Sequence, residues 1–207
     1  MTTSTFKKIS ILLVSLLALA IFSTGCTEKE KSDDLIEMTK AYIASVDGFY
    51  YEHFDLEKAK EELSTIIADD FASDSIEQME KIDKGITFDD KTYTGKDALN
   101  YMFRDSDKVE MKYEISKVYD DLDPDRTYHK YVFVRLTVSR YDSDGNLFFQ
   151  YTPIFKYFFV EKDGVWRLYF EDLAGYSNKI GEVPTKTFSN ENVEFEEFKS
   201  FTIDIDK

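Results

Sequence analysis

In the stretch YHKYVFVRLTVSRY, residues 128–141, aliphatic side chains alternate with aromatic or polar ones. The two alternating sets are Val132, Val134, Leu136 and Val138 on one side and Tyr131, Phe133, Arg135 and Thr137 on the other. Such alternation predicts a long β-strand. The turn sequence DSDGN, residues 142–146, then leads into a second apolar run, 147–160, so the two runs predict an antiparallel hairpin. Pro153 cannot donate a ladder hydrogen bond, and we expect a bulge or bend there.

Shorter alternating runs flank this hairpin. Residues 109–115 predict a strand with one wet face, and residues 165–170 predict the last long strand after a turn at 162–164. In that last strand Trp166, Leu168 and Phe170 are expected to share a face because they lie two positions apart.

The N-terminal half of the chain shows helical spacing instead, with apolar residues every three or four positions. The expected helices begin at Asp34, Asp55, Ser75 and Thr94, and the second one carries the stripe Ala59, Leu63, Ile66 and Ile67. A short strand is expected at 86–88. Helices followed by long antiparallel strands define an α+β fold. We expect the N-terminal helices to pack on a curved, mostly antiparallel sheet of about four to six strands.

The order of these elements resembles the nuclear-transport-factor-2-like cone family, which includes the SnoaL-like cyclases and ketosteroid isomerase. The likeness covers residues 34–172 and is carried by the first helix, Thr94-Gly95-Lys96-Asp97-Ala98-Leu99, Tyr131-Val132-Phe133-Val134, Asp144-Gly145, Tyr157-Phe158-Phe159 and Asp163-Gly164-Val165-Trp166-Arg167-Leu168. The resemblance implies a pocket between sheet and helices. In enzymes of this family a carboxylate or histidine in that pocket, often with a tyrosine, performs proton chemistry.

No catalytic position of that family transfers to this chain, because no carboxylate lies on an otherwise apolar strand face. The candidate residues for lining such a pocket are Tyr113, Tyr131, Tyr157, Tyr169 and Trp166. The two histidines, His53 and His129, lie far apart in the sequence and are expected at the surface.

The first 26 residues predict where the protein resides. Lys7 and Lys8 precede an apolar run of 14 residues, 9–22, and Ser23-Thr24-Gly25-Cys26 follows. This order resembles the export signal of a bacterial lipoprotein, although Ser23 stands where that signal usually has an aliphatic residue. The resemblance implies cleavage between Gly25 and Cys26 and a diacylglyceryl thioether on Cys26. The apolar run is too short to cross about 30 Å of hydrocarbon. An ordinary secretory signal is the alternative.

These patterns divide the chain into four parts. We expect a signal peptide at 1–25, a flexible polar tether at 26–33, the α+β domain at 34–172 and a C-terminal extension at 173–207. The extension begins as a loop and ends in alternating apolar residues. It is expected either to add an edge strand to the same sheet or to act as an arm that docks on another protein.

Charge and cysteine content exclude several classes of function. The net charge is −15, and removal of the signal peptide makes it more negative because both of its charged residues are lysines. Phosphates repel such a surface, so no nucleic acid partner is expected. A single cysteine allows no disulfide and no thiolate metal site, and we expect no metal and no cofactor. Lysine is far commoner than arginine, which favours an AT-rich, Gram-positive host over a Gram-negative one.

The sequence therefore predicts a lipoprotein held on the extracytoplasmic face of the cell membrane through Cys26, without catalytic activity. Its partner is expected to be another protein or, as the alternative, a small hydrophobic ligand in an aromatic pocket. A third hypothesis is an isomerase or cyclase of the SnoaL type. An apolar cavity that holds one buried carboxylate or histidine beside a tyrosine would favour this third hypothesis, and a filled cone would exclude it.

Overall fold

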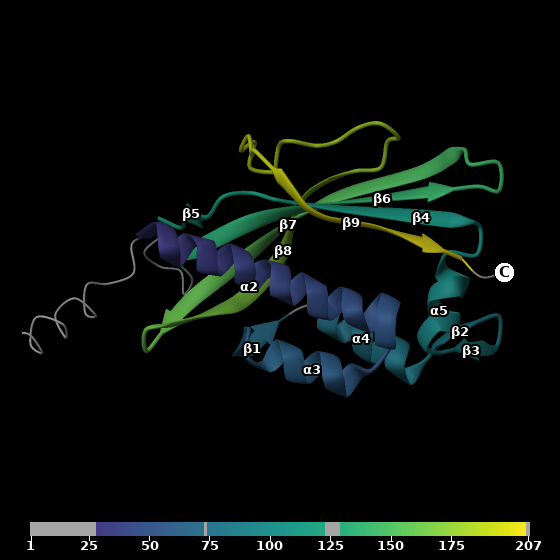
Figure 1. The fold of residues 1–207 in the computed structure, drawn as a ribbon, viewed down its shortest axis with the longest axis horizontal. Helices are drawn as coiled ribbons and strands as arrows, with labels where there is room; N and C mark the ends of the chain where they lie inside the picture. Colours follow the sequence, from purple (N-terminus) through teal and green to yellow (C-terminus); the bar gives the residue numbers. More distant parts are fainter. Residues whose placement is uncertain (1–27, 73, 123–128, 206–207) are drawn as a thin grey trace, which may run out of the picture. The chain divides into compact units, whose positions relative to one another are not determined.

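The computed structural model in Figure 1 describes residues 28–72, 74–122 and 129–205. The chain divides into two units, 1–34 and 35–207. Of the first unit, residues 28–34 are described, and they form the start of helix α2 (Glu28–Gly48). The expected signal peptide, with Gly25 and Cys26, lies outside the described residues.

Helix α2 begins inside the segment 26–33, which the sequence suggests is a flexible tether. Residues 28–31 read Glu-Lys-Glu-Lys, and both residue types are strong helix formers, so a polar segment of this composition can continue a helix. None of the described helices is long and apolar enough to cross a membrane.

The second unit contains the remaining helices. These are the π-helical turn η1 (Phe49–His53) and the α-helices α3 (Leu56–Ser64), α4 (Asp74–Lys84) and α5 (Gly95–Met102). The expected cap of the second helix is confirmed, because the Asp55 carboxylate accepts a hydrogen bond of 3.0 Å from the backbone N–H of Lys58. Thr94 occupies the N-cap position of α5 without a side-chain cap bond, and α4 begins one residue ahead of Ser75.

One helix is shorter than the sequence predicts. The expected stripe of the second helix continues through Ile67, but α3 ends at Ser64 and Ile67 starts strand β1 (Ile67–Ala72). This strand runs parallel to β8 (Val165–Ser177), with Ile67 opposite Leu168. The prediction is wrong here because the partner strand is about a hundred residues away in the chain, and the spacing of neighbouring residues cannot reveal such a partner.

The α+β class is confirmed, and the main sheet is mixed and strongly curled. Its other strands are β4 (Lys108–Ile115), β5 (Tyr119–Asp120), β6 (Lys130–Tyr141), β7 (Leu147–Lys162) and β9 (Glu196–Asp204). The strand order is β1-β8-β7-β6-β4-β9, and β5 pairs with β6. The sheet has seven strands rather than four to six, since β1 and the short β5 carry no clear alternation. A separate hairpin joins β2 (Ile86–Phe88), which was expected, to β3 (Lys91–Tyr93), which was not.

Irregularities in the β7–β8 ladder change which side chains share a face. One register shift falls between Ile154 and Phe155, next to Pro153, as the sequence predicts. A second falls between Phe158 and Phe159, where Tyr169 is the extra residue of β8 between Leu168 and Phe170. Because an inserted residue reverses the alternation, Phe170 faces the side opposite to Leu168, and the expectation that they share a face is wrong.

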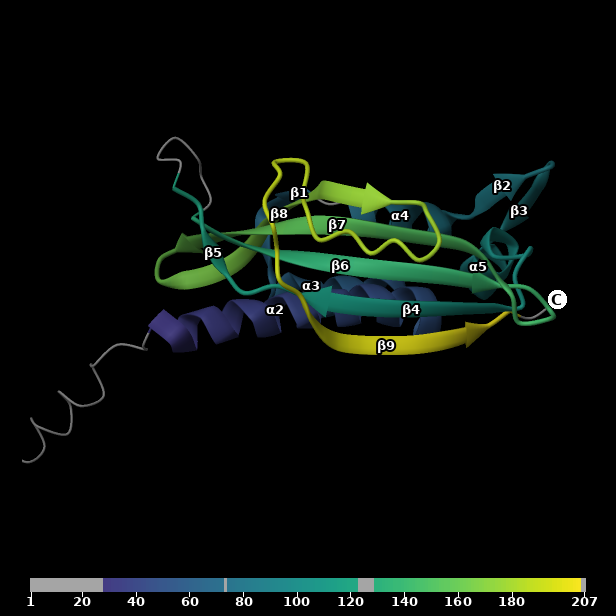
Figure 2. The ribbon, with the colours of Figure 1, turned by 90° about the horizontal axis from the view of Figure 1, so that it is seen from above.

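The two faces of the sheet are covered differently. The helices cover the inner face, where the main core lies. On the outer face a smaller cluster contains Tyr131, Phe133 and Phe158. The segment 178–195 crosses over that face, as Figure 2 shows. It is held there by Arg135, whose guanidinium donates to the Pro184 carbonyl at 2.8 Å.

Arg135 also anchors a buried ion pair on the outer face. Its Nε donates to the Glu114 carboxylate at 2.9 Å. Burial alone would raise the pKa of Glu114, but Arg135 and Lys112 hold that pKa below its usual value.

The C-terminal extension belongs to the sheet. Strand β8 runs across the expected domain boundary at 172–173, and β9 pairs antiparallel with β4 at the sheet edge. Residues 196–204 therefore form an edge strand of the same sheet, as the first of the two expectations has it, and docking of this segment on another protein stays a prediction.

Candidate functional site

A cavity of about 170 Å³ lies between the first helix and the inner face of the sheet. Its lining consists of five tyrosines, five apolar side chains and one carboxylate, Asp47. The tyrosines are Tyr42 from α2, Tyr50 and Tyr51 from η1, Tyr113 from β4 and Tyr157 from β7. An engineered apolar cavity of about 150 Å³ admits benzene, so a small organic molecule fits this space.

The strand residues of the cavity converge because their ladders are in register. Tyr113 lies opposite Leu136, Val134 lies opposite Phe155, and Val132 lies opposite Tyr157. Directly opposed residues share a face, and every second residue of a strand points the same way. Alternation in three strands thus places these side chains on the inner face together.

The π-helical turn presents two of the tyrosines. After Gly48 the helix widens over Phe49–His53, and this turn ends at Phe54 in the left-handed region, at φ 52°. Single π-turns inside helices often accompany functional sites. Here the turn directly follows Asp47, so Tyr50 and Tyr51 line the same cavity as that carboxylate.

Asp47 is the charged centre of the cavity wall and is 3% exposed. The hydroxyl of Tyr113 donates to Oδ1 at 2.8 Å, and the ammonium of Lys199 lies 2.7 Å from Oδ2. Lys199 reaches it because β9 places Lys199 opposite Tyr113 in the β4–β9 ladder. Burial raises the pKa of Asp47 above its usual value, and the hydrogen bonds from Lys199 and Tyr113 act against that rise.

Burial and nearby carboxylates raise the pKa values of four of the cavity tyrosines, Tyr50, Tyr51, Tyr113 and Tyr157. The pKa of Tyr113 is well above its usual value because of burial and then the charge of Asp47. Burial, followed by the charge of Glu171, raises the pKa of Tyr157 in the same way. The hydroxyl of Tyr42 donates to the Glu171 carboxylate at 3.1 Å. The site therefore offers neutral hydroxyl donors and aromatic rings at neutral pH.

Only two of the five pocket residues that the sequence suggests lie in this cavity, Tyr113 and Tyr157. Tyr131 lies on the outer face, where Lys156 sits 3.6 Å from its ring centroid. Trp166 packs at the margin of the main core, and Tyr169 lines a different cleft. Strand alternation predicts two sets of residues but does not say which set faces the helices.

Neither Asp47 nor Lys199 is among the site residues that the sequence predicts. Asp47 lies on a helix that is amphipathic in its apolar spacing, and Lys199 lies in the extension expected outside the domain. A signal for the first exists in hindsight. Asp47 lies four positions after the apolar Ile43, so one helical turn places its carboxylate near the apolar face.

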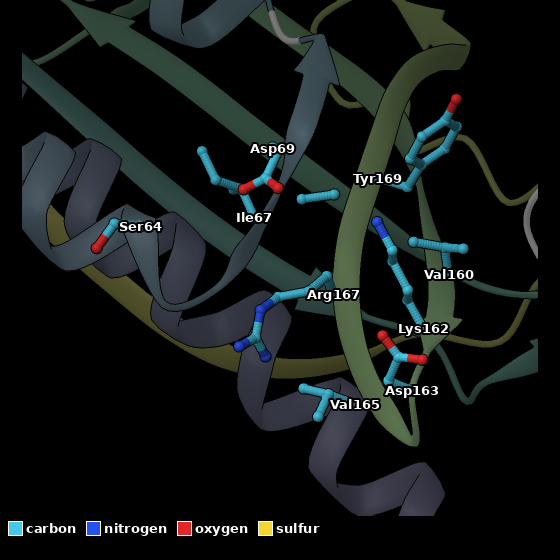
Figure 3. A pocket seen from close by; sticks show the side chains of 10 residues that line it. Ser64, Ile67, Asp69, Val160, Lys162, Asp163, Val165, Arg167 and Tyr169 are labelled. Carbon is cyan, nitrogen blue, oxygen red and sulfur yellow. The ribbon is translucent and has the colours of Figure 1, made fainter.

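A wider cleft of about 670 Å³ opens at the other edge of the sheet, between β1 and the β7–β8 hairpin (Figure 3). Its charged residues include Asp69, Lys162 and Arg167. In Figure 3 the side chains of Lys162 and Arg167 extend in different directions rather than toward one point. Convergent polar groups mark a binding site, and the tyrosine-lined cavity is therefore the better candidate.

His53 takes no part in the cavity. Its Nδ1 accepts a hydrogen bond of 3.0 Å from the backbone N–H of Asp55, so the ring closes the turn between η1 and α3. The Asp142 carboxylate is likewise used by its own hairpin turn, where it accepts from the backbone N–H groups of Asp144 and Asn146. Both contacts are structural.

Comparison with models of known protein families, with curated proteins and with solved structures finds no match to this chain.

Proposed function

We propose that this protein is a lipid-anchored, extracytoplasmic binding module whose interior cavity holds a small molecule. The observation that carries the proposal is the cavity of about 170 Å³, lined by five tyrosines around the buried carboxylate of Asp47. Concave sites with an apolar lining and a few convergent polar groups are the usual form of small-molecule sites.

We also propose that the domain is a nuclear-transport-factor-2-like cone. The support is the arrangement of N-terminal helices on the inner face of a curled, mostly antiparallel sheet, with a cavity between the two layers. The parallel strand β1 and the short strand β5 are additions to the elements expected from that family's order.

The lipid anchor rests on the sequence of residues 1–26. A lipidated Cys26 would hold the domain at the membrane despite a net charge of −15, since anionic lipid repels such a surface. Metabolic labelling with an alkyne palmitate should tag the native chain and leave a Cys26→Ser variant untagged. Equal labelling of both chains, or a protein that stays in the cytosol, would overturn this part of the proposal.

We favour a small ligand over a protein partner because the cavity gathers five tyrosines and the Asp47 carboxylate around one small space. A thermal-shift screen of molecules up to about the size of an indole tests the proposal. A ligand at a hundred times its Kd adds about 2.7 kcal/mol of stability. For a domain of this length that is a rise in Tm of about 5–11 °C.

A cavity-filling variant provides the matched control. Leu136→Phe adds volume where Leu136 lines the cavity, and it should abolish the shift while leaving the fold intact. If no molecule of this size range shifts the native Tm, or if the filled variant responds equally, the cavity is not a binding site.

Asp47 beside Tyr113 also supports a second candidate, a proton-transfer enzyme of the SnoaL type. Against it, each Asp47 oxygen already accepts a hydrogen bond, from Tyr113 on one side and Lys199 on the other. A carboxylate held in this way is a weaker base than a free one at the same depth. We therefore propose binding without catalysis. Turnover of an enolisable ketone by the native chain and not by Asp47→Asn would reverse that choice.

A further inference from the structure

We propose that the cavity selects a small quaternary ammonium ion of about the size of choline. The inference rests on the proposed function, that this cavity binds a small molecule, and adds the chemical class of that molecule. Three observations support the inference: the aromatic lining of the cavity, the charges around it and the hydrogen bonds already made at Asp47.

The charges around the cavity favour a cation. Glu171 lies opposite Tyr157 in the β7–β8 ladder, so it shares the inner face with that ring, and it accepts a hydrogen bond from Tyr42. Two carboxylates, Asp47 and Glu171, thus stand beside the cavity, whereas Lys199 is the cation that contacts Asp47. The charge of Glu171 acts on two of the rings that line the cavity, Tyr50 and Tyr157, so this carboxylate would attract a cation placed between those rings and repel an anion.

The pKa values of the cavity tyrosines report the same negative charge. The charge of Glu171, after burial itself, raises the pKa of Tyr50 and of Tyr157. A positive ligand between these rings would offset the influence of that carboxylate, whereas a neutral apolar ligand would leave it unchanged.

The wall is suited to a cation because it is aromatic. Tyr42 meets Tyr157 edge to face with ring centroids 5.7 Å apart, and Phe155 lies 6.4 Å from Tyr157. Several electron-rich rings around one small space form the kind of cage that binds quaternary ammonium groups. The protein already places one of its own ammonium groups at the margin, since Lys199 lies 5.0 Å from the Phe201 ring centroid.

The hydrogen bonds at Asp47 favour a quaternary rather than a primary ammonium. A primary ammonium carries three N–H donors and needs acceptors for them. In the part of the chain that the structure describes, Asp47 is the one carboxylate that lines the cavity, and a primary ammonium would have to share its oxygens with Tyr113 and Lys199. A quaternary group has no N–H to satisfy and binds through ring faces and charge alone.

Calorimetric titration of the full chain with choline and with 3,3-dimethylbutan-1-ol tests the inference. The second probe has the same shape as choline, with an uncharged carbon in place of nitrogen. We expect choline to bind about tenfold or more tightly, because cation–π attraction in a desolvated site exceeds the contact energy of the neutral isostere.

Two variants report the cause of that preference. Glu171→Gln should weaken choline binding several-fold and leave the isostere unchanged, because it removes charge and keeps the shape. Tyr157→Leu should weaken choline binding more than Tyr157→Phe, which keeps the ring. Unfolding curves confirm that each variant is folded before titration.

The outcomes separate the two proposals. Equal or tighter binding of the isostere refutes the selection of a cation and leaves the proposed small-molecule site standing. Binding of neither probe, together with a negative screen of other small molecules, refutes both. Loss of choline preference in Glu171→Gln supports the inference, and an unchanged preference in that variant removes its electrostatic basis.

Discussion

Replacement of Lys199 by methionine would leave Asp47 buried without its ion-pair partner. Breaking a fully buried ion pair by removing one partner costs about 3–5 kcal/mol. The Lys199 side chain is 30% exposed, and Tyr113 continues to donate to Asp47, so water and one hydrogen bond still screen the carboxylate. We therefore expect the free energy of unfolding to fall by about 2–3 kcal/mol at pH 7. For a domain of this length this corresponds to a fall in Tm of about 4–12 °C.

The loss should depend on pH in a defined direction. The folded-state pKa of Asp47 is already raised, and Lys199→Met removes an influence that lowers it. A carboxyl that binds its proton more tightly in the folded chain makes stability fall as pH rises through the folded-state pKa. The difference in unfolding free energy between the variant and the native protein should therefore be full at pH 7 and narrow as the pH falls toward about 4, because protonation of Asp47 removes the unpaired charge.

Urea unfolding at both pH values provides the measurement. Lys179→Met is the matched control, because Lys179 pairs with Glu182 at 3.2 Å on the surface with a side chain 78% exposed. That change should cost less than about 1 kcal/mol at either pH. The double variant Asp47→Asn with Lys199→Met should recover most of the loss. A Lys199→Met protein as stable as the native one, or a loss that is independent of both pH and Asp47→Asn, would refute the reasoning.

Three further changes test the fold by denaturant unfolding. Leu168→Ala removes a side chain that is 0% exposed and should cost about 2–5 kcal/mol, whereas Phe170→Ala, 36% exposed on the other face, should cost about 1 kcal/mol; equal losses would contradict the bulge between them. Arg135→Met should cost about 2–3 kcal/mol because it removes the buried partner of Glu114 and leaves Lys112, 3.2 Å from that carboxylate, as its ion-pair partner, and limited proteolysis should then cut the segment 178–195 sooner than in the native chain. Asp55→Ala should cost about 1 kcal/mol by removing the α3 cap, and an unchanged midpoint would show that this bond contributes nothing.

Much of the fold could be predicted from the sequence because its signals are local. The alternation at 128–141, the turn at 142–146 and the cap at Asp55 each involve residues close together in the chain. The turn and the cap are confirmed, and the strand is confirmed for Lys130–Tyr141, while residue 128 lies outside the described residues. The errors occur where a distant partner acts. Ile67 leaves the helix for a parallel pairing with β8, and the bulge at Tyr169 reverses the face of Phe170.

The candidate site was only partly predictable for the same reason. Aromatic residues on strands indicate that a pocket lining is available, but the choice between two faces depends on which face the helices cover. Tyr113 and Tyr157 lie on the face that the helices cover, whereas Tyr131 lies on the outer face, which the segment 178–195 crosses.

The sequence by itself determined the α+β class, the long hairpin, the starts of α3 and α5 and the strongly acidic net charge, because periodicity, capping and charge are properties of neighbouring residues. Only the tertiary structure decided that Asp47 meets Lys199, which lies 152 positions away, and that five tyrosines surround them. A buried charge is tolerated only where a partner and hydrogen bonds compensate it. That compensation is supplied by the pairing of β9 with β4, which no local pattern specifies.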